Sequence, residues 1–410
     1  MSRRVVITGL GIVSPVGIGR EAFWSNLTNG RTGIKPITLF DTDRLSCKTA
    51  GEISEFDPHL ALPGMKTGTL NRSAQLVCAA AKLGLEDAGI ELNDVTKPQI
   101  GVMIGSTLAI MHTYSEFDRG AITGGYVTAS PIDFANTIPI TTAGYISVLF
   151  GVSNFNSVIS SGESSCLDAI NYGASFVRNG QAEMVLAGGV EALSLETYLI
   201  NYLPRFLSGS KAGEREFCAP YGRERNGFVL GESGAVVVLE NYDHAIARGA
   251  RIYGELRGVA STFDGQAFYN STPPATGLTK AMQLAIRRSQ LTPEDIDYFG
   301  AGANSSVAID QAEASAIRNV FGSRADELHI SAVKSMTGEC FSASVGVQVC
   351  ATALALHEGV VPPTLNCDDQ DPDCSLPLSS ESREVEIKAG LISTVAASGL
   401  AGALVITKTQ

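Results

Sequence analysis

Two glutamates stand where helices are expected to begin. Glu163 follows residues 157–160 (SVIS), a short β-branched run that leads through a small-residue turn into a helix. Glu339 lies at a second turn of this kind, after residues 330–333 (ISAV). Free backbone N–H groups and the helix dipole favour anions at such a turn, and they activate a thiolate placed there. Each turn could therefore serve nucleophilic chemistry, yet each carries a carboxylate.

Other residues that commonly serve in catalysis or metal binding are few in the 410-residue chain. It has five histidines, eight cysteines without metal-ligand spacing, and a net charge of −12. The charge argues against nucleic-acid or anionic-membrane partners. Scattered cysteines fit a reduced cytoplasm, and no apolar run approaches the ~20 residues of a membrane span. We therefore expect a cytoplasmic protein with no metal site, no membrane partner and no cofactor of its own.

The order of the predicted elements repeats along the chain. A helix over 74–88 precedes a strand over 100–105, and a helix over 279–290 precedes a strand over 297–301. The strand at 157–160 leads into a small-residue helix and then a strand over 184–189. The strand at 330–333 leads in the same way into a helix over 338–356. This predicts an α/β fold made of two similar halves, 1–250 and 251–410.

Several motifs along the chain resemble those of one family, the β-ketoacyl synthases of the thiolase superfamily. The motifs are residues 6–17 (VITGLGIVSPVG), 187–192 (AGGVEA), 225–232 (RNGFVLGE), 310–314 (DQAEA) and 333–338 (VKSMTG). The resemblance covers nearly the whole length. It implies a thiolase-like fold, in which duplicated βαβ halves form a five-layer αβαβα sandwich.

The resemblance also implies that three catalytic residues of the family are replaced in this chain. Active members carry a cysteine and two histidines at positions that correspond here to Glu163, Gly302 and Glu339; the motif lysine is kept as Lys334. Condensation needs a thiolate to hold the acyl chain and imidazoles to stabilise the enolate. We therefore predict that the chain has no catalytic residues for condensation. We interpret Cys166, one helical turn beyond Glu163, as a core thiol and not as a replacement nucleophile.

A class of such subunits exists in the family. Residues 164–169 (SSCLDA) and 258–264 (GVASTFD) resemble the chain-length factors, or ketosynthase β subunits, of bacterial type II polyketide synthases. The resemblance implies a heterodimer with a Cys-bearing ketosynthase, and a substrate carried on the phosphopantetheine of an acyl carrier protein. Aromatic-polyketide members usually have Gln where this chain has Glu163, so other bacterial pathways remain open.

Two other functions remain open at this point. One is a malonyl-carrier decarboxylase that supplies starter units, although its relatives rely on the histidines that are missing here. The other is a scaffold in another thiolase-like complex.

The role of Glu163 has two interpretations. It is a carboxylate that accepts backbone N–H bonds at the helix N-terminus, or it forms a buried ion pair with Lys334 or with a partner group.

The acyl tunnel is expected beside residues 106–117 (STLAIMHTYSEF), which in the family reach across the dimer. Bulky side chains there would stop a growing chain by steric exclusion. The predicted wall residues are Leu108, Met111, His112, Phe117, Thr197 and Tyr198. Ordinary packing in the dimer core is the alternative for each of them.

Overall fold

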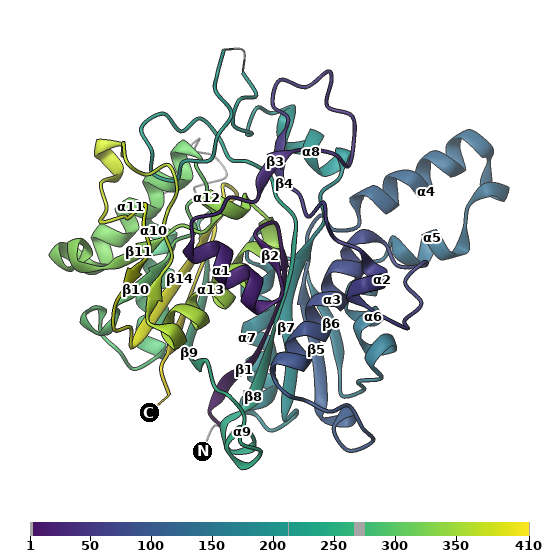
Figure 1. Ribbon diagram of the computed structural model, residues 1–410, viewed down its shortest axis with the longest axis horizontal. Coiled ribbons are helices and arrows are strands. Elements are labelled where there is room, and N and C mark those ends of the chain that lie inside the picture. Colours follow the sequence, from purple (N-terminus) through teal and green to yellow (C-terminus); the bar gives the residue numbers. More distant parts are fainter. Residues whose placement is uncertain (1–2, 212, 266–274, 410) are drawn as a thin grey trace.

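A computed structural model describes residues 3–211, 213–265 and 275–409 (Figure 1). The strands are β1 (Val5–Ser14), β2 (Gly17–Ile18), β3 (Ile34–Pro36), β4 (Thr49–Gly51), β5 (Ile100–Gly105), β6 (Asn156–Ile159), β7 (Met184–Glu191), β8 (Ser233–Asn241), β9 (Gly254–Phe263), β10 (Tyr298–Gly300), β11 (His329–Ser331), β12 (Val360–Val361), β13 (Arg383–Glu384), β14 (Ala389–Val395) and β15 (Leu400–Thr407). The helices are α1 (Arg20–Thr28), α2 (Pro58–Ala61), α3 (Arg72–Asp87), α4 (Met111–Gly124), α5 (Pro131–Asn136), α6 (Thr141–Phe150), α7 (Ser165–Arg178), α8 (Leu195–Tyr202), α9 (Tyr242–Ala247), α10 (Ala275–Arg288), α11 (Val307–Phe321), α12 (Lys334–Thr337) and α13 (Ser344–Glu358).

The main strands form two sets with the same order. One set runs β6-β5-β7-β8-β1 and the other runs β11-β10-β14-β15-β9. In each set the first three strands are parallel and the last two pairings are antiparallel. The sets join where β1 and β9 pair over two residues of each strand. Identical strand order and direction confirm the predicted duplication.

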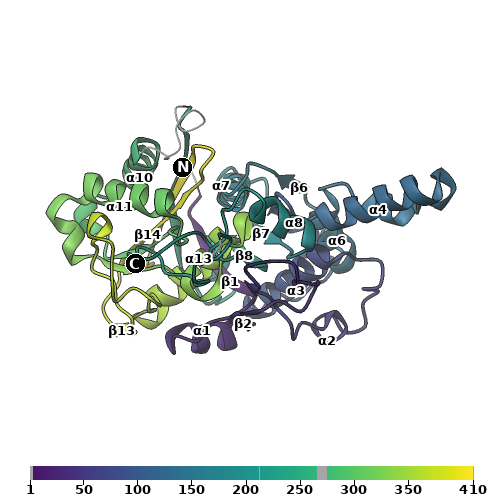
Figure 2. The ribbon, with the colours of Figure 1, turned by 90° about the horizontal axis from the view of Figure 1, so that it is seen from above.

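The helices place these two sets in a layered arrangement (Figures 1 and 2). Helices α7 and α13 contact each other between the sets, with α7 against β7 and α13 against both β8 and β14. Helices α3 and α6 pack on the first set, while α10 and α11 pack beside the second. The order is therefore helix, sheet, helix, sheet, helix, and it confirms the predicted five-layer αβαβα sandwich.

The central position of α13 explains its composition. All of its residues from Ser344 to Leu356 are buried. A helix that is apolar on every side is stable only when it is covered on every side, as it is between two sheets. The sequence placed the start of this helix at Gly338, which is wrong. Gly338 has φ of 74° and ends α12, and a 3-10 turn over Phe341–Ala343 precedes α13.

The glycines of β1 permit close packing against α3. A Cβ at Gly11 would lie 1.8 Å from the Ala80 carbonyl oxygen, and one at Gly9 would lie 2.3 Å from that of Gly84. Only glycine can occupy these positions while the helix backbone approaches so closely. These glycines therefore serve helix–sheet packing.

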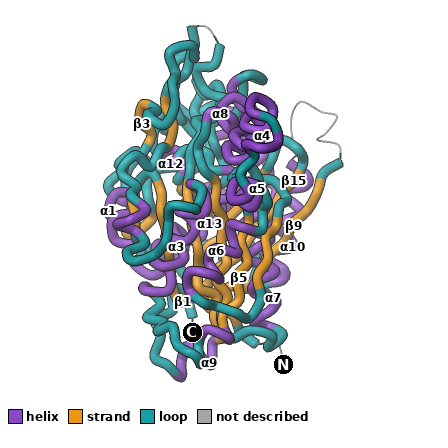
Figure 3. Tube along the Cα trace, turned by 90° about the vertical axis from the view of Figure 1, so that its right-hand side faces the viewer, coloured by secondary structure: helices purple, strands orange, loops and turns teal. Residues whose placement is uncertain are grey.

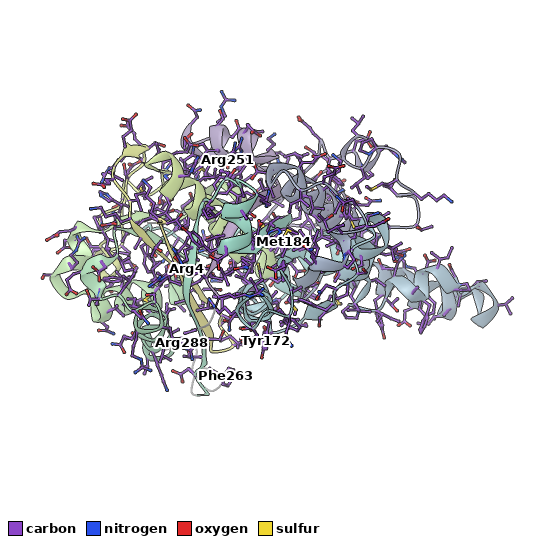
Figure 4. All side chains as sticks on the ribbon, turned by 90° about the horizontal axis from the view of Figure 1, so that it is seen from below. Arg4, Tyr172, Met184, Arg251, Phe263 and Arg288 are labelled. Carbon is purple, nitrogen blue, oxygen red and sulfur yellow. The ribbon has the colours of Figure 1, made fainter. Side chains whose placement is uncertain are left out.

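The core lies on both faces of the sheets. Met184 at the start of β7 lies deep in the interior, whereas Arg251 and Arg288 lie at the periphery (Figure 4). All eight cysteines are buried free thiols. No helix in the described ranges is long and apolar enough to cross a membrane.

An arm made of α4 and α5 extends from the body beside the first strand set (Figures 1 and 2), and in Figure 3 it points toward the viewer. No residue of α4 is buried. The arm begins directly after β5 and the loop of residues 106–110, and α4 contacts α8 near its base. It holds three of the six predicted tunnel-wall residues, namely Met111, His112 and Phe117.

Candidate functional site: a buried cluster around Lys334 and Glu339

The first of the two turns connects β6 to α7. Gly162 has φ of 65°, a conformation that favours glycine. The Ser161 N–H donates to Ser165 Oγ at 2.9 Å, which closes the turn. Glu163 is half-buried and lies two residues before the first residue of α7. The N-cap of the helix is Ser164, so Glu163 stands just outside the helix.

The surroundings of Glu163 favour its protonated form. Burial raises the pKa of Glu163, its own backbone N–H lowers it, the Glu339 carboxylate raises it, and the Lys334 ammonium lowers it. The two glutamates and the lysine are therefore close enough to interact. Two neighbouring carboxylates repel each other when both are ionised.

Lys334 makes its ion pair with Glu339. The Lys334 ammonium donates to Glu339 Oε2 at 2.7 Å and to the Gly302 carbonyl at 2.9 Å, and both side chains are buried. Lys334 forms no ion pair with Glu163. The interpretation in which Lys334 pairs with Glu163 is therefore wrong, because the Lys334 ammonium forms its ion pair with Glu339 instead.

Further donors surround the Glu339 carboxylate. Asn304 Nδ2 donates to its Oε2 at 2.8 Å. The Phe341 N–H at 2.9 Å and the Ser344 hydroxyl at 2.8 Å donate to its Oε1. A buried carboxylate is tolerated only when it is paired and hydrogen-bonded, and both conditions hold here. Both carboxylate oxygens of Glu339 thus accept hydrogen bonds from groups of this chain, and the residue has a structural role.

The backbone at Gly302 leaves no room for a side chain. A Cβ there would lie 2.8 Å from the Ser393 carbonyl oxygen and 3.2 Å from Glu313 Oε1. The Glu313 carboxylate accepts the N–H groups of Gly302 at 2.8 Å and Ala303 at 2.7 Å. An imidazole therefore cannot be added at this position without moving the backbone around it.

Cys166 lies inside the core. It is fully buried among apolar residues between the sheets. Burial raises the pKa of the Cys166 thiol well above its ordinary value. A buried neutral thiol is a poor nucleophile, which agrees with its interpretation as a packing residue.

Glu191 was not among the predicted site residues, although it anchors the loop that enters the arm. Its carboxylate accepts the Thr107 N–H at 2.7 Å, the Leu108 N–H at 3.0 Å and the Ser342 hydroxyl at 2.6 Å. The available signal was its place in residues 187–192, at the end of a buried strand. Burial raises the pKa of Glu191 to about 7.

The raised pKa of Glu191 predicts a pH-dependent stability. The folded protein holds the proton more tightly than the unfolded chain, whose carboxyl has a pKa near 4.5. Its contribution to stability is therefore complete below about pH 4.5 and is lost as the pH rises through about 7, by up to about 1.4 kcal/mol per pH unit. Glu191→Gln should remove the part of the pH dependence of the free energy of unfolding that Glu191 supplies.

Chemical denaturation between about pH 5 and about pH 8 measures this slope. Burial also raises the pKa of Asp310 to about 7, so the variant should keep the part of the slope that Asp310 supplies. Glu86→Gln, on the exposed side of α3, serves as the control and should leave the slope unchanged. An equal slope in wild type and Glu191→Gln would contradict the prediction.

A groove of about 730 Å³ lies between the arm, α8 and the loops that precede α3. Leu108 and His112 line it, together with Ala109, Ile132 and Leu193. The other four predicted wall residues do not. Met111 and Phe117 lie on α4, where the Phe117 ring packs against Phe134 with centroids 5.8 Å apart.

Thr197 and Tyr198 are buried within α8. Thr197 forms a capping box with Ser194. The Tyr198 hydroxyl donates to the Cys47 carbonyl at 2.9 Å, and its ring packs near Phe40. The structure therefore brings Leu108 and His112 together in the groove and places Thr197 and Tyr198 behind its wall.

The fold agrees with the comparisons to known proteins. The N-terminal domain model of the β-ketoacyl synthases matches residues 2–245, and the C-terminal domain model matches residues 253–368. The chain belongs to the β-ketoacyl synthase family.

Individual relatives are similar over the full length. A 3-oxoacyl-[acyl-carrier-protein] synthase 2 of Coxiella burnetii is 32% identical over 408 residues, covering 99% of each chain. A solved structure described as the ishigamide ketosynthase/chain length factor matches with a TM-score of 0.93 at 26% identity, covering 100% of both chains. A second, AntDE:AntF, described as a type II PKS acyl-carrier protein in complex with its ketosynthase bound to the hexaketide, matches with a TM-score of 0.90 at 28% identity over 100% of both chains.

Proposed function

We propose that this chain is a non-catalytic chain-length factor of a bacterial type II polyketide synthase. In this role it pairs with a Cys-bearing ketosynthase in the cytoplasm and shapes the tunnel that receives the growing acyl chain. The substrate is carried on the phosphopantetheine of an acyl carrier protein. The chain itself contributes no condensing residue.

One observation carries the proposal: the rebuilt centre around Lys334 and Glu339. A condensing enzyme stabilises developing negative charge with imidazoles. Here Glu339 places a carboxylate at that position and Gly302 excludes a side chain. Because every polar group of the Lys334–Glu339 pair is bound within the chain, the centre supports the fold and not a reaction.

The outer edge of the first strand set and the surface of the arm both support binding to a partner chain. β6 stands at the end of the sheet, and within the described ranges no strand pairs with its outer edge. Unpaired edges are templates for pairing with another chain. Large apolar side chains are also exposed on or next to the arm, namely Ile122, Val127, Ile132, Phe134, Ile138, Ile140 and, on α6, Val148. Exposed apolar residues gathered in this way mark an interaction surface.

Two of the structural neighbours support a ketosynthase as that partner. Their descriptions name a ketosynthase/chain length factor and a ketosynthase with its acyl-carrier protein. In the proposed heterodimer, Leu108 and His112 form part of the tunnel wall. Met111 and Phe117 hold the arm in place, and Thr197 and Tyr198 support the opposite wall from within α8.

Leu108→Ala tests the proposal through the length of the product. In the reconstituted pair with a carrier protein, the variant should give a longer acyl chain, because removing a bulky wall side chain extends the available space. Mass spectrometry of the carrier-bound products measures the length. Leu60→Ala, on the exposed face of α2, is the control and should give the wild-type product.

Two outcomes would contradict the proposal. Condensation by this chain without a ketosynthase would show that it is catalytic. An unchanged product from Leu108→Ala, together with release of CO2 from malonyl-carrier protein by this chain alone, would favour the decarboxylase.

A further inference from the structure

Three side chains with metal-binding atoms meet where α4 passes α8, at the edge of the groove. They are His112 and Glu116 of α4 and Glu196 of α8. His112 Nδ1 lies 3.1 Å from Glu196 Oε2, and one ligand atom of each residue lies within 4.8 Å of the other two. All three residues line the groove.

The two helices bring these residues together for simple geometric reasons. His112 and Glu116 are four residues apart, so they lie on the same face of α4. Glu196 lies in the first turn of α8, whose start is fixed by the capping box of Ser194 and Thr197. Since Glu196 is 84 residues from His112 in the chain, no local sequence pattern reveals the group.

The side chains can close around an ion with little rearrangement. Ligand atoms bound at about 2.0–2.1 Å in a tetrahedral site are about 3.3 Å apart. The distances in the group exceed this by up to about 1.5 Å, and rotation between staggered conformers of exposed side chains covers such a change. Arg119 donates to Glu116 Oε1, which leaves Glu116 Oε2 for a cation.

We propose that His112, Glu116 and Glu196 bind one divalent first-row transition-metal ion and thereby fasten α4 to α8. One imidazole and two carboxylates suit Zn²⁺, Co²⁺, Fe²⁺ or Mn²⁺. An imidazole disfavours Mg²⁺ and Ca²⁺, which take oxygen ligands. The charge agrees as well, because the two carboxylates carry −2 and the Arg119 guanidinium offsets one of these charges, which leaves a negative site for a cation.

The consequence is structural. Since α4 buries none of its own residues, its position over the groove depends on a small number of contacts. A metal bridge would add a strong link between the arm and the body, at the residues that line the groove. The site does not depend on the proposed chain-length role, because it uses residues of this chain alone.

Titration of the full chain with Co²⁺ and Zn²⁺ after chelator treatment tests the proposal. Visible absorption of bound Co²⁺ and calorimetry with Zn²⁺ should show one ion per chain. His112→Ala, Glu116→Gln and Glu196→Gln should each weaken binding by about 100-fold, the upper end of the loss seen when a residue that supports a metal ligand is removed. Asp133→Asn is the matched control, because Asp133 is an acidic groove residue outside the group.

Hydrogen exchange provides a second measurement. Zn²⁺ should slow amide exchange in α4 and α8 of the wild-type chain, and this protection should be absent in His112→Ala. Circular dichroism of each variant checks that the chain is folded. No binding by the wild-type chain, or the same affinity in all three variants, would overturn the proposal. An equal loss in Asp133→Asn would also overturn it, because it would show general attraction to a negative groove.

Discussion

Replacing Lys334 with methionine should destabilise the protein by about 3–5 kcal/mol. The change removes the cation that neutralises buried Glu339 but keeps an apolar side chain of similar length. A buried charge left without its partner costs far more than an exposed one, because it has lost both water and its counterion. Chemical denaturation of wild type and variant measures the difference in the free energy of unfolding.

Lys82→Met is the matched control for this experiment. Lys82 and Glu86 form an ion pair of nearly the same length, 2.6 Å against 2.7 Å, but on the surface of α3. Its loss should cost no more than about 1 kcal/mol. The double variant Lys334→Met/Glu339→Gln removes both buried charges and should recover part of the stability. Equal costs at Lys334 and Lys82 would show that the buried pair has no special structural role.

Ile122→Asp should weaken the proposed heterodimer by at least about 2 kcal/mol, which is about 30-fold in Kd. Ile122 lies on α4 and is 78% exposed, so a charge there costs the isolated chain little. In an interface the same carboxylate would have to lose its water without gaining a partner. Affinity between the variant and the ketosynthase measures the effect.

Ile246→Asp is the control for the interface prediction. Ile246 is 55% exposed on α9, which lies at the bottom of the molecule in Figure 1, away from the arm. It should leave the affinity unchanged. The thermal midpoints of both variants should match that of wild type, since neither side chain belongs to the core. Equal affinities for Ile122→Asp and wild type would place the partner elsewhere.

The duplicated fold could be predicted because local sequence patterns indicate each of its strands and helices. Strands such as 100–105 and 184–189 are continuous apolar runs, and small-residue helices follow the turns at Glu163 and Glu339. Such runs are typical of strands and helices that are covered on both sides. The structure confirms the order of these elements in both halves.

The start of α13 was harder to predict. The small residues after Gly338 fit a helix and a turn equally well, and the turn prevails because Glu339 is bound by Lys334 and by the Phe341 N–H. Long-range contacts thus decided a boundary that local sequence left open. Helix ends depend on such contacts more than helix interiors do.

The electrostatics of the centre also lay beyond the sequence. Lys334 is near both glutamates, and nothing in the residue order shows that it binds Glu339 while the pKa of Glu163 rises through burial. The same holds for Glu191, whose role depends on a loop 84 residues earlier in the chain. The resemblance to the family's motifs indicated which residues share the site, and only three-dimensional packing shows which of them pair.

Native mass spectrometry of this chain co-expressed with a Cys-bearing ketosynthase tests the central claim most directly. The proposed chain-length role predicts a one-to-one heterodimer, formed through the open β6 edge and the apolar arm. A stable homodimer of this chain that does not bind the ketosynthase would contradict the proposed chain-length role.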